Sequence, residues 1–371
     1  NRRLALFALA FLLMYVIGGA RSFPLFVAGV AAVLILGWLS ESSETGESAV
    51  PAPASSREIF LLIVFLILAL LFRLYQVDIF PRLYSVDEQL FAQVALELRE
   101  RPLQFFSEPH IMKPHLLRIG SIWLAFSTLG VGLFQQRTIS AFEGALTILP
   151  VYLLCGKLRG NRAGLFAAFL LAVEPWHIGH SRLGVHDIEG PLFLAGLFLL
   201  TIRAVEEGGK RNFAFLGAAA GATMYLYLSC LVMAPYFLVM APLGRYFRNG
   251  AHRAALLKEG TLMAAAAVVV ALPYFTLGRA NISELENFYT AGGNFLNAAK
   301  ENDWSPLFAL FVNAWRGIDY LADWTSRAVH PARTVYPNPV AAGLFLFGAG
   351  MLLRTPKKFQ NILVLLWLPI A

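Results

Sequence analysis

Charged residues are scarce in this chain of 371 residues. Only 14% are Asp, Glu, Lys or Arg, while 58% are hydrophobic. Soluble domains carry about 25% charged residues and could not bury so much apolar surface. Apolar runs long enough to cross a hydrocarbon core of about 30 Å recur along the whole sequence. Since these runs are too long and too uniformly apolar for barrel strands, we predict an all-α, polytopic membrane protein.

The chain also has few cysteines. Cys155 and Cys230 are the two it contains, and both lie inside apolar runs, so the sequence indicates neither a disulfide framework nor a cysteine metal cluster. The net charge of +7 comes from short clusters of Lys and Arg between apolar runs. These clusters form no continuous basic face, which argues against nucleic acid as a partner. They are instead expected to mark cytoplasmic loops of a protein in the plasma (inner) membrane.

The distribution of apolar runs, about twelve in all, predicts three parts of the chain. Residues 1–39 form a two-helix transmembrane appendage, and residues 40–57, rich in Ser, Glu, Ala and Pro, form a flexible linker. Residues 58–371 form the main transmembrane domain. Because an apolar run is in progress at Ala371, we expect the natural protein to continue beyond this residue.

The predicted topology contains one irregular segment. With the basic clusters in the cytoplasm, the outer face holds two long segments, 76–114 and 278–336, and a short turn, 179–188. An even number of crossings must then separate the first segment from the turn, yet three apolar runs lie between them: 115–133, 138–155 and 163–178. We expect one of them, 115–133 or its neighbour, not to span the bilayer fully.

The first outer segment contains two adjacent acids, Asp87 and Glu88. Ser85 and Glu88 have the spacing of a capping box, and the apolar residues that follow recur at helical spacing. This pattern predicts an amphipathic helix on the membrane surface, with both acids at its positively polarised start. Two interpretations stay open: ordinary first-turn acids, or acids that take part in chemistry.

The turn between two strongly apolar runs concentrates polar side chains. Within residues 174–189 lie three histidines, three acids and an arginine, a set that is costly at a membrane boundary unless its members pair or work. A solvated interfacial turn is the simple interpretation. Besides a solvated turn and a set of catalytic residues, metal binding is another interpretation, with His177, His180 and His186 as the candidate ligands. The spacing of these histidines matches no strong ligand signature.

Several motifs in the same order resemble the protein mannosyltransferase and aminoarabinose transferase group of the GT-C glycosyltransferase superfamily. The likeness runs from about Glu58 to the end of the chain. The motifs that carry it are Asp87 and Glu88; Lys113, Pro114, His115 and Leu116; Arg137, Ser140, Ala141 and Gly144; Tyr152, Leu153 and Leu154; the turn Lys157 to Arg162; Pro175 to Asp187; Tyr225 to Ser229; and Pro235. Two departures are His115, where the family commonly has a second proline, and the additional histidines of the turn.

This resemblance implies a GT-C-like helix bundle and an enzyme that moves a sugar from a polyprenyl phosphate to a hydroxyl of a protein, lipid or envelope glycan on the extracytoplasmic face. It implies Asp87 as the base, with Glu88 and Asp187 stabilising the transition state or orienting the acceptor. The leaving phosphate needs cations. The resemblance suggests for this role Arg182, Arg137, Lys113, His115 and His180. No cofactor is certain, but a divalent metal is possible, with His177 and His186 as weak ligand candidates.

Two other classes of protein remain open at this point. A transporter or flippase also carries polar groups in the membrane, although its charges are expected near mid-bilayer rather than at one face. A catalytically silent subunit of a membrane complex would suit the N-terminal appendage. The outer segment 278–336 contains aromatic and acidic residues that fit either substrate contact or an interfacial aromatic belt.

Overall fold

The computed structural model describes residues 5, 6, 9, 32, 35, 55–82, 84–102, 105, 115–226, 230, 232–250, 253–277, 339–355 and 358–367. Two compact units divide the chain. One consists of Ala49–Glu284, and the other combines Asn1–Ser48 with Leu285–Ala371. The appendage 1–39 and the linker 40–57 lie almost entirely outside the described residues, so the predicted domain division stays a prediction.

All elements of the described chain are helical. In unit Ala49–Glu284 they are α3 (Ser56–Leu74), α4 (Val86–Glu100), α6 (Leu116–Leu129), α7 (Leu133–Leu146), α8 (Ile148–Arg159), α9 (Asn161–Val173), α10 (Pro175–Ser181), η1 (His186–Ile188), α11 (Glu189–Glu207), α12 (Lys210–Ala222), η2 (Thr223–Tyr225), α13 (Met233–Asn249) and α14 (Arg253–Leu277). The other unit contributes α17 (Pro339–Arg354) and α18 (Phe359–Trp367), which pack on each other.

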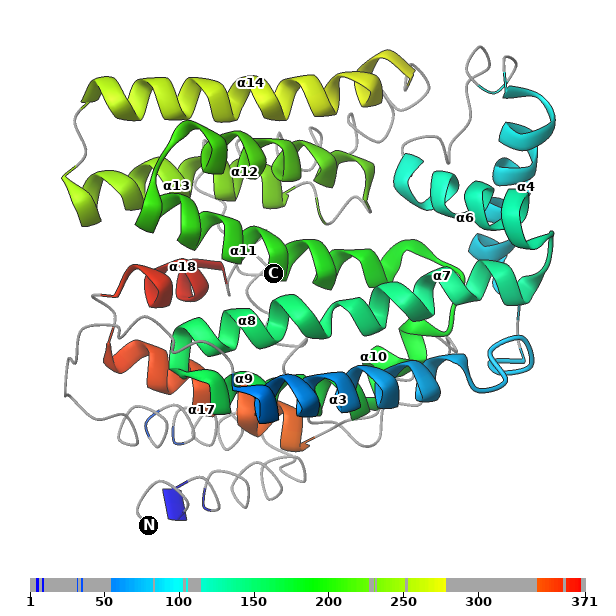
Figure 1. Cartoon of the computed structure of the whole chain (residues 1–371), viewed down its shortest axis with the longest axis horizontal. Coiled ribbons are helices and arrows are strands. Elements are labelled where there is room, and N and C mark those ends of the chain that lie inside the picture. Colours follow the sequence, from blue (N-terminus) through cyan, green and yellow to red (C-terminus); the bar gives the residue numbers. More distant parts are fainter. Residues whose placement is uncertain are drawn as a thin grey trace, which may run out of the picture. The chain divides into compact units, whose positions relative to one another are not determined.

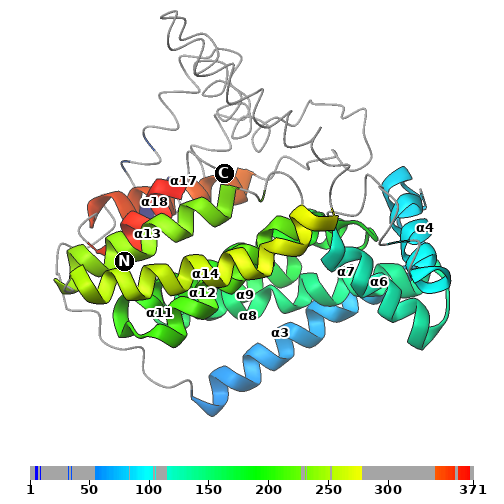
Figure 2. The same ribbon diagram turned by 90° about the horizontal axis from the view of Figure 1, so that it is seen from above.

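Long helices of the first unit lie side by side, with α4 and α6 at one end of them (Figures 1 and 2). Helix α12 packs closely on α14, where Gly217 and Gly221 face backbone oxygens of Met263 and Ala267. A Cβ at either glycine would collide with that backbone, so close contact between these two helices depends on both glycines.

Three described helices are long and apolar enough to span a membrane: Leu133–Arg159, His186–Glu207 and Ala254–Tyr274. The first of them joins α7 and α8 into one candidate span. Helix α6 has 14 residues, which gives a length of about 21 Å and falls short of a hydrocarbon core of about 30 Å. Helix α9, in the run 163–178, has 13 residues and is equally short, so the expectation that the run 115–133 or its neighbour does not cross stays a prediction.

The predicted helix after Ser85 is confirmed as α4, and its capping box is complete. The Ser85 side chain accepts from the Glu88 backbone N–H, while the Glu88 side chain accepts from the Ser85 N–H. The apolar face of α4 was expected to lie against lipid, but it packs on α6 instead. The shared core contains Phe91, Val94, Ala95, Phe105, Ile119, Ile122 and Phe126. This contact explains why a helix too short to span is stable at the end of the bundle.

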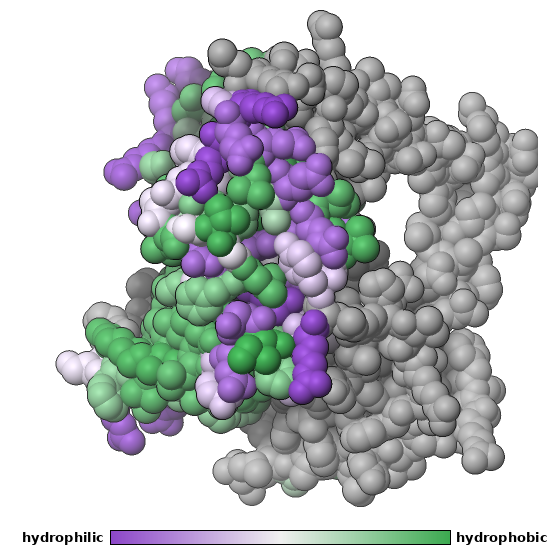
Figure 3. Space-filling model, turned by 90° about the vertical axis from the view of Figure 1, so that its right-hand side faces the viewer, coloured by the Kyte–Doolittle hydropathy of each residue, from purple (hydrophilic) through white to green (hydrophobic). Residues whose placement is uncertain are grey.

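The opposite end of the bundle carries the basic clusters. Lys157 and Arg248 both pair with Glu206 at the end of α11, and Arg245 lies 3.8 Å from Glu259 of α14. The face around α4 and α6 is different, since hydrophilic residues gather on its upper half and a hydrophobic area adjoins them (Figure 3). The first unit therefore has one end rich in ion pairs between helix termini and another that carries the predicted acids.

Candidate active site

The two predicted acids Asp87 and Asp187 lie at the same end of the helical bundle. Asp87 is in the first turn of α4, and Asp187 is in η1, directly before α11. Both are exposed, and the side chain of Asp187 is 42% accessible. The charges of both act on the ring of His186. Two carboxylates from segments a hundred residues apart thus face one region.

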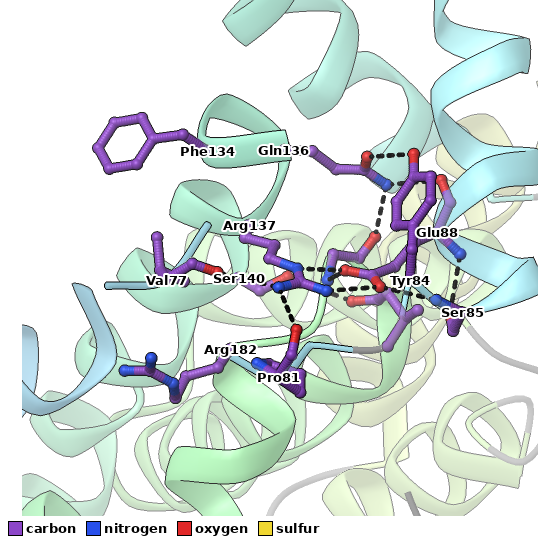
Figure 4. Close-up of polar contacts among 12 residues, drawn as sticks. Val77, Pro81, Tyr84, Ser85, Glu88, Phe134, Gln136, Arg137, Ser140 and Arg182 are labelled. Atoms are coloured by element: carbon purple, nitrogen blue, oxygen red, sulfur yellow. Dashed lines mark hydrogen bonds and ion pairs between the residues drawn. The ribbon is translucent and has the colours of Figure 1, made fainter. Parts of the chain in front are cut away.

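Glu88 connects the two acid-bearing segments and is completely buried. Arg137 of α7 makes a bidentate contact with its carboxylate: Nε donates to Oε1 at 2.7 Å and Nη2 donates to Oε2 at 3.0 Å. The backbone N–H of Gly184 donates to the same Oε1 at 2.7 Å, and the Ser85 N–H donates to Oε2 at 3.0 Å (Figure 4). Each carboxylate oxygen therefore has two donors, and the start of α4 is fixed to the turn before η1.

Arg137 is held on its other side by the chain between α3 and α4. Its Nη1 donates to the carbonyls of Val77 at 3.0 Å and Pro81 at 2.9 Å. The neighbouring Gln136 adds bonds from Nε2 to the carbonyls of Glu88 and Gly184. Arg137 was predicted to bind the donor phosphate, but its guanidinium is buried and bound to protein on both sides. The geometry favours a structural role for this arginine.

Arg182 forms a second clamp on the chain after α3. Its Nη1 and Nη2 donate to the carbonyls of Phe72, Tyr75 and Phe80 at 2.7, 2.7 and 3.0 Å. The first of these carbonyls belongs to the last turn of α3, where helical partners are lacking. Desolvation, followed by the charge of Arg137, lowers the pKa of Arg182. Both prongs of Arg182 are thus engaged by main-chain oxygens, which the phosphate prediction did not anticipate.

A fully buried arginine that was not predicted lies on α6. Arg118 contacts two acids, Glu143 of α7 at 2.5 Å from Nη2 and Glu189 of α11 at 3.0 Å from Nε. Its Nη1 also donates to Ser140 at 3.2 Å. A charge inside the apolar run 115–133 was the available signal, because intramembrane ionisable residues mark functional or paired positions.

Histidines surround Asp187. The rings of His115 and His186 lie 4.6 Å apart, and each contacts Phe91 edge-on. Burial lowers the pKa of His115 to about 3, so this ring is neutral at physiological pH and offers a phosphate hydrogen bonds rather than charge. The Nδ1 of His180 lies 3.5 Å from Asp187 Oδ2. Among the described residues, His180 is the predicted phosphate ligand that lies next to an exposed acid.

Residues 121–279 match the family model described as dolichyl-phosphate-mannose-protein mannosyltransferase. The match covers 159 of the 371 residues, and over this region the chain is similar to that family. It is accordingly a multi-pass membrane glycosyltransferase that uses a polyprenyl-phosphate sugar as its donor and a separate acceptor. A search of curated proteins found no match. The matched region contains Arg137, Arg182 and Asp187 and begins after Asp87, Glu88 and Arg118.

The two weak metal candidates, His177 and His186, lie in different surroundings. The Nδ1 of His177 accepts from Arg73 Nη2 at 2.9 Å, and burial lowers the pKa of His177 to about 3. His186 instead contacts His115 and Phe91. Within the described part of the chain, no group of three or more His, Cys, Asp or Glu residues has the geometry of a metal site.

Two predicted parts of the glycosyltransferase site lie outside the described residues: Lys113, a predicted phosphate ligand, and the whole aromatic outer segment 278–336. Sequence reasoning placed the exposed acids Asp87 and Asp187. It missed Arg118 and Glu143, although the charge of Arg118 inside an apolar run was a signal. It also missed the bond between Glu88 and Gly184, because pairing across 96 residues leaves no local pattern.

Proposed function

We propose that this glycosyltransferase transfers its sugar to a hydroxyl on the extracytoplasmic face with Asp87 as the catalytic base. The observation that supports this assignment most is the bond from Gly184 to Glu88, which holds the segment bearing Asp87 next to the turn that bears Asp187. Asp87 is exposed beside a fully buried neighbour. An exposed carboxylate on a fixed backbone can meet an acceptor, whereas Glu88 is already saturated with donors.

The proposed reaction is a single displacement at the anomeric carbon. The acceptor oxygen forms a bond to that carbon, the bond from the carbon to the phosphate oxygen breaks, and the acceptor proton passes to Asp87. The lipid phosphate leaves with the electron pair of the broken bond. Asp187 faces the same region, where its negative charge stabilises the positive charge that develops on the sugar.

The leaving phosphate needs positive charge that is not already committed. Arg137 and Arg182 are bound by protein groups, so we assign them to holding the site together. His180, next to Asp187, and Lys113, which lies outside the described residues, are the first side chains to test as phosphate ligands. Their substitution is expected to raise KM for the donor, whereas loss of Asp87 is expected to lower kcat.

The membrane orientation is also part of the proposal. Basic residues lie at the end of the bundle away from Asp87 and Asp187. By the positive-inside rule this end faces the cytoplasm, so the acids face outward. The family description makes a protein hydroxyl the first acceptor to test; lipid and envelope glycan hydroxyls complete the panel. Association with other membrane proteins is a further possibility that co-purification would reveal.

The decisive measurement is sugar transfer by the full chain reconstituted in lipid nanodiscs. With dolichyl-phosphate-[3H]mannose and a panel of hydroxyl acceptors, Asp87→Asn should lower kcat by about 10²- to 10⁴-fold, because a general base contributes about that factor. Asp78→Asn is the matched control, since Asp78 is an exposed acid in the same outer segment. Full activity in Asp87→Asn would contradict the base assignment. A wild type that binds the donor and transfers nothing would favour the silent-subunit interpretation.

A further inference from the structure

The short helix η1, which carries Asp187, is anchored on both sides while Asp187 itself is exposed. Val185, His186, Ile188 and Glu189 are buried, with side chains or whole residues between 1% and 7% accessible. Asp187 is 42% accessible in its side chain. The chain is therefore held immediately before and after the one residue that points outward.

Arg118 is the residue on which both anchors converge. On the far side of η1, Nε of Arg118 lies 3.0 Å from Glu189, the first residue of α11. On the near side, its Nη1 donates to Ser140 Oγ at 3.2 Å, and this hydroxyl in turn contacts the carbonyl of Val185 at 3.4 Å. One guanidinium thus reaches both ends of the segment that holds Asp187.

The arginine is itself fixed by its surroundings. Its side chain has no accessible surface, and Glu143 of α7 holds Nη2. Directly before α6, the ring of His115 contacts that of His186 in η1. Helices α6, α7 and α11 therefore meet at Arg118, and a planar fork with several donors suits this three-way contact better than the single ammonium of lysine.

We propose that Arg118 is a positioning residue for the transfer reaction, acting through Glu189 and Ser140 to hold Asp187 toward the sugar. This inference rests on the proposed function, because it assumes that Asp187 faces the reacting sugar. Arg118 has no exposed surface with which to touch substrate. Its contribution is expected in kcat, since a displacement of about 1 Å of a catalytic group costs about 10²-fold in rate.

The test is a double-mutant cycle measured as kcat and KM for dolichyl-phosphate-[3H]mannose, with the full chain in nanodiscs. Arg118→Met should lower kcat by about 10²-fold with KM changed less than threefold. In an Asp187→Asn background, the same substitution should lower the residual kcat by less than threefold, because its target is already gone. Arg118→Lys should recover only part of the rate. Arg203→Met is the control on α11, since Arg203 is 60% exposed.

A purely structural role predicts a different pattern. If Arg118→Met lowers kcat equally in the wild-type and Asp187→Asn backgrounds, the inference is overturned. Glu189→Gln serves where Arg118→Met does not fold, and it should show the same dependence on Asp187. If Asp187→Asn alone leaves kcat unchanged, or the wild type transfers no sugar, the proposed function fails, and the fault lies there rather than with Arg118.

Discussion

Two buried arginine–carboxylate centres lie behind the exposed acids, and they differ in how completely they are satisfied. At the Glu88 centre, one arginine meets one carboxylate, and each carboxylate oxygen accepts two hydrogen bonds. At the Glu189 centre, one arginine meets two carboxylates, Glu143 and Glu189. Neither oxygen of Glu189 has a well-aligned hydrogen bond among the described residues.

The carboxylate of Glu88 has all its hydrogen bonds satisfied by protein groups, whereas the carboxylate of Glu189 can accept a bond from another donor. Glu88 also caps α4, so its carboxylate is committed to the backbone as well as to Arg137. Glu189 holds only the start of α11 and its ion pair with Arg118. We therefore expect the Glu88 centre to dominate stability and the Glu189 centre to be more important for the reaction.

The largest expected effect on stability is at the Glu88 centre. Glu88→Gln removes the counter-charge of a buried guanidinium, which should cost about 3 to 5 kcal/mol in the free energy of unfolding. Glu143→Gln should cost less, about 1 to 2 kcal/mol, because Glu189 still faces Arg118. Denaturant unfolding in detergent micelles would measure both. Glu100→Gln, at the exposed end of α4, is the control, and a larger loss from Glu143→Gln would refute the comparison.

Sequence reasoning predicted the helical class, the start of α4 and the two exposed acids because each depends on local signals. Capping residues and apolar spacing act within a few positions. It assigned Arg137 and Arg182 to phosphate because a charge in a motif does not show what it contacts. Their partners, Glu88 and the carbonyls after α3, become visible only when α7 and α10 are packed against α3.

The pH dependence of stability should come next in size. His115 and His177 both have pKa values of about 3 in the folded protein, below the unfolded value of about 6.5. As pH falls below about 6.5, the unfolded chain binds protons that the folded chain refuses until about pH 3. The free energy of unfolding should therefore drop between these limits, by on the order of 1 to 2 kcal/mol per histidine at pH 5.

Single substitutions of the two histidines show how much each contributes to the decline of the free energy of unfolding with falling pH. His115 lies beside the Glu189 centre, whereas His177 lies beside Arg73. His115→Phe and His177→Phe should each flatten the decline of stability between pH 7 and pH 5, whatever they do to stability at pH 7. A slope that neither substitution alters would show that other groups titrate in this range.

The smallest effect is expected at the surface of α11, far from both centres. The Arg203–Glu207 pair is more than half exposed on both sides, and such pairs contribute little to stability. Arg203→Met should leave the unfolding midpoint in detergent and the transfer rate unchanged within error. A measurable loss of activity would mean that the end of the bundle with the basic clusters is coupled to the acids, which neither centre predicts.

Because Glu88, in the first turn of α4, also binds Arg137 and Gly184, this helix is fixed at its start. Any swing of α4 must be greatest at Glu100 and close to zero at Asp87. A substrate that displaces the C-terminal end of α4, for instance a long lipid entering from the side, would leave the proposed base Asp87 in place beside Asp187. The enzyme could then admit a bulky donor without disassembling the place where its sugar reacts.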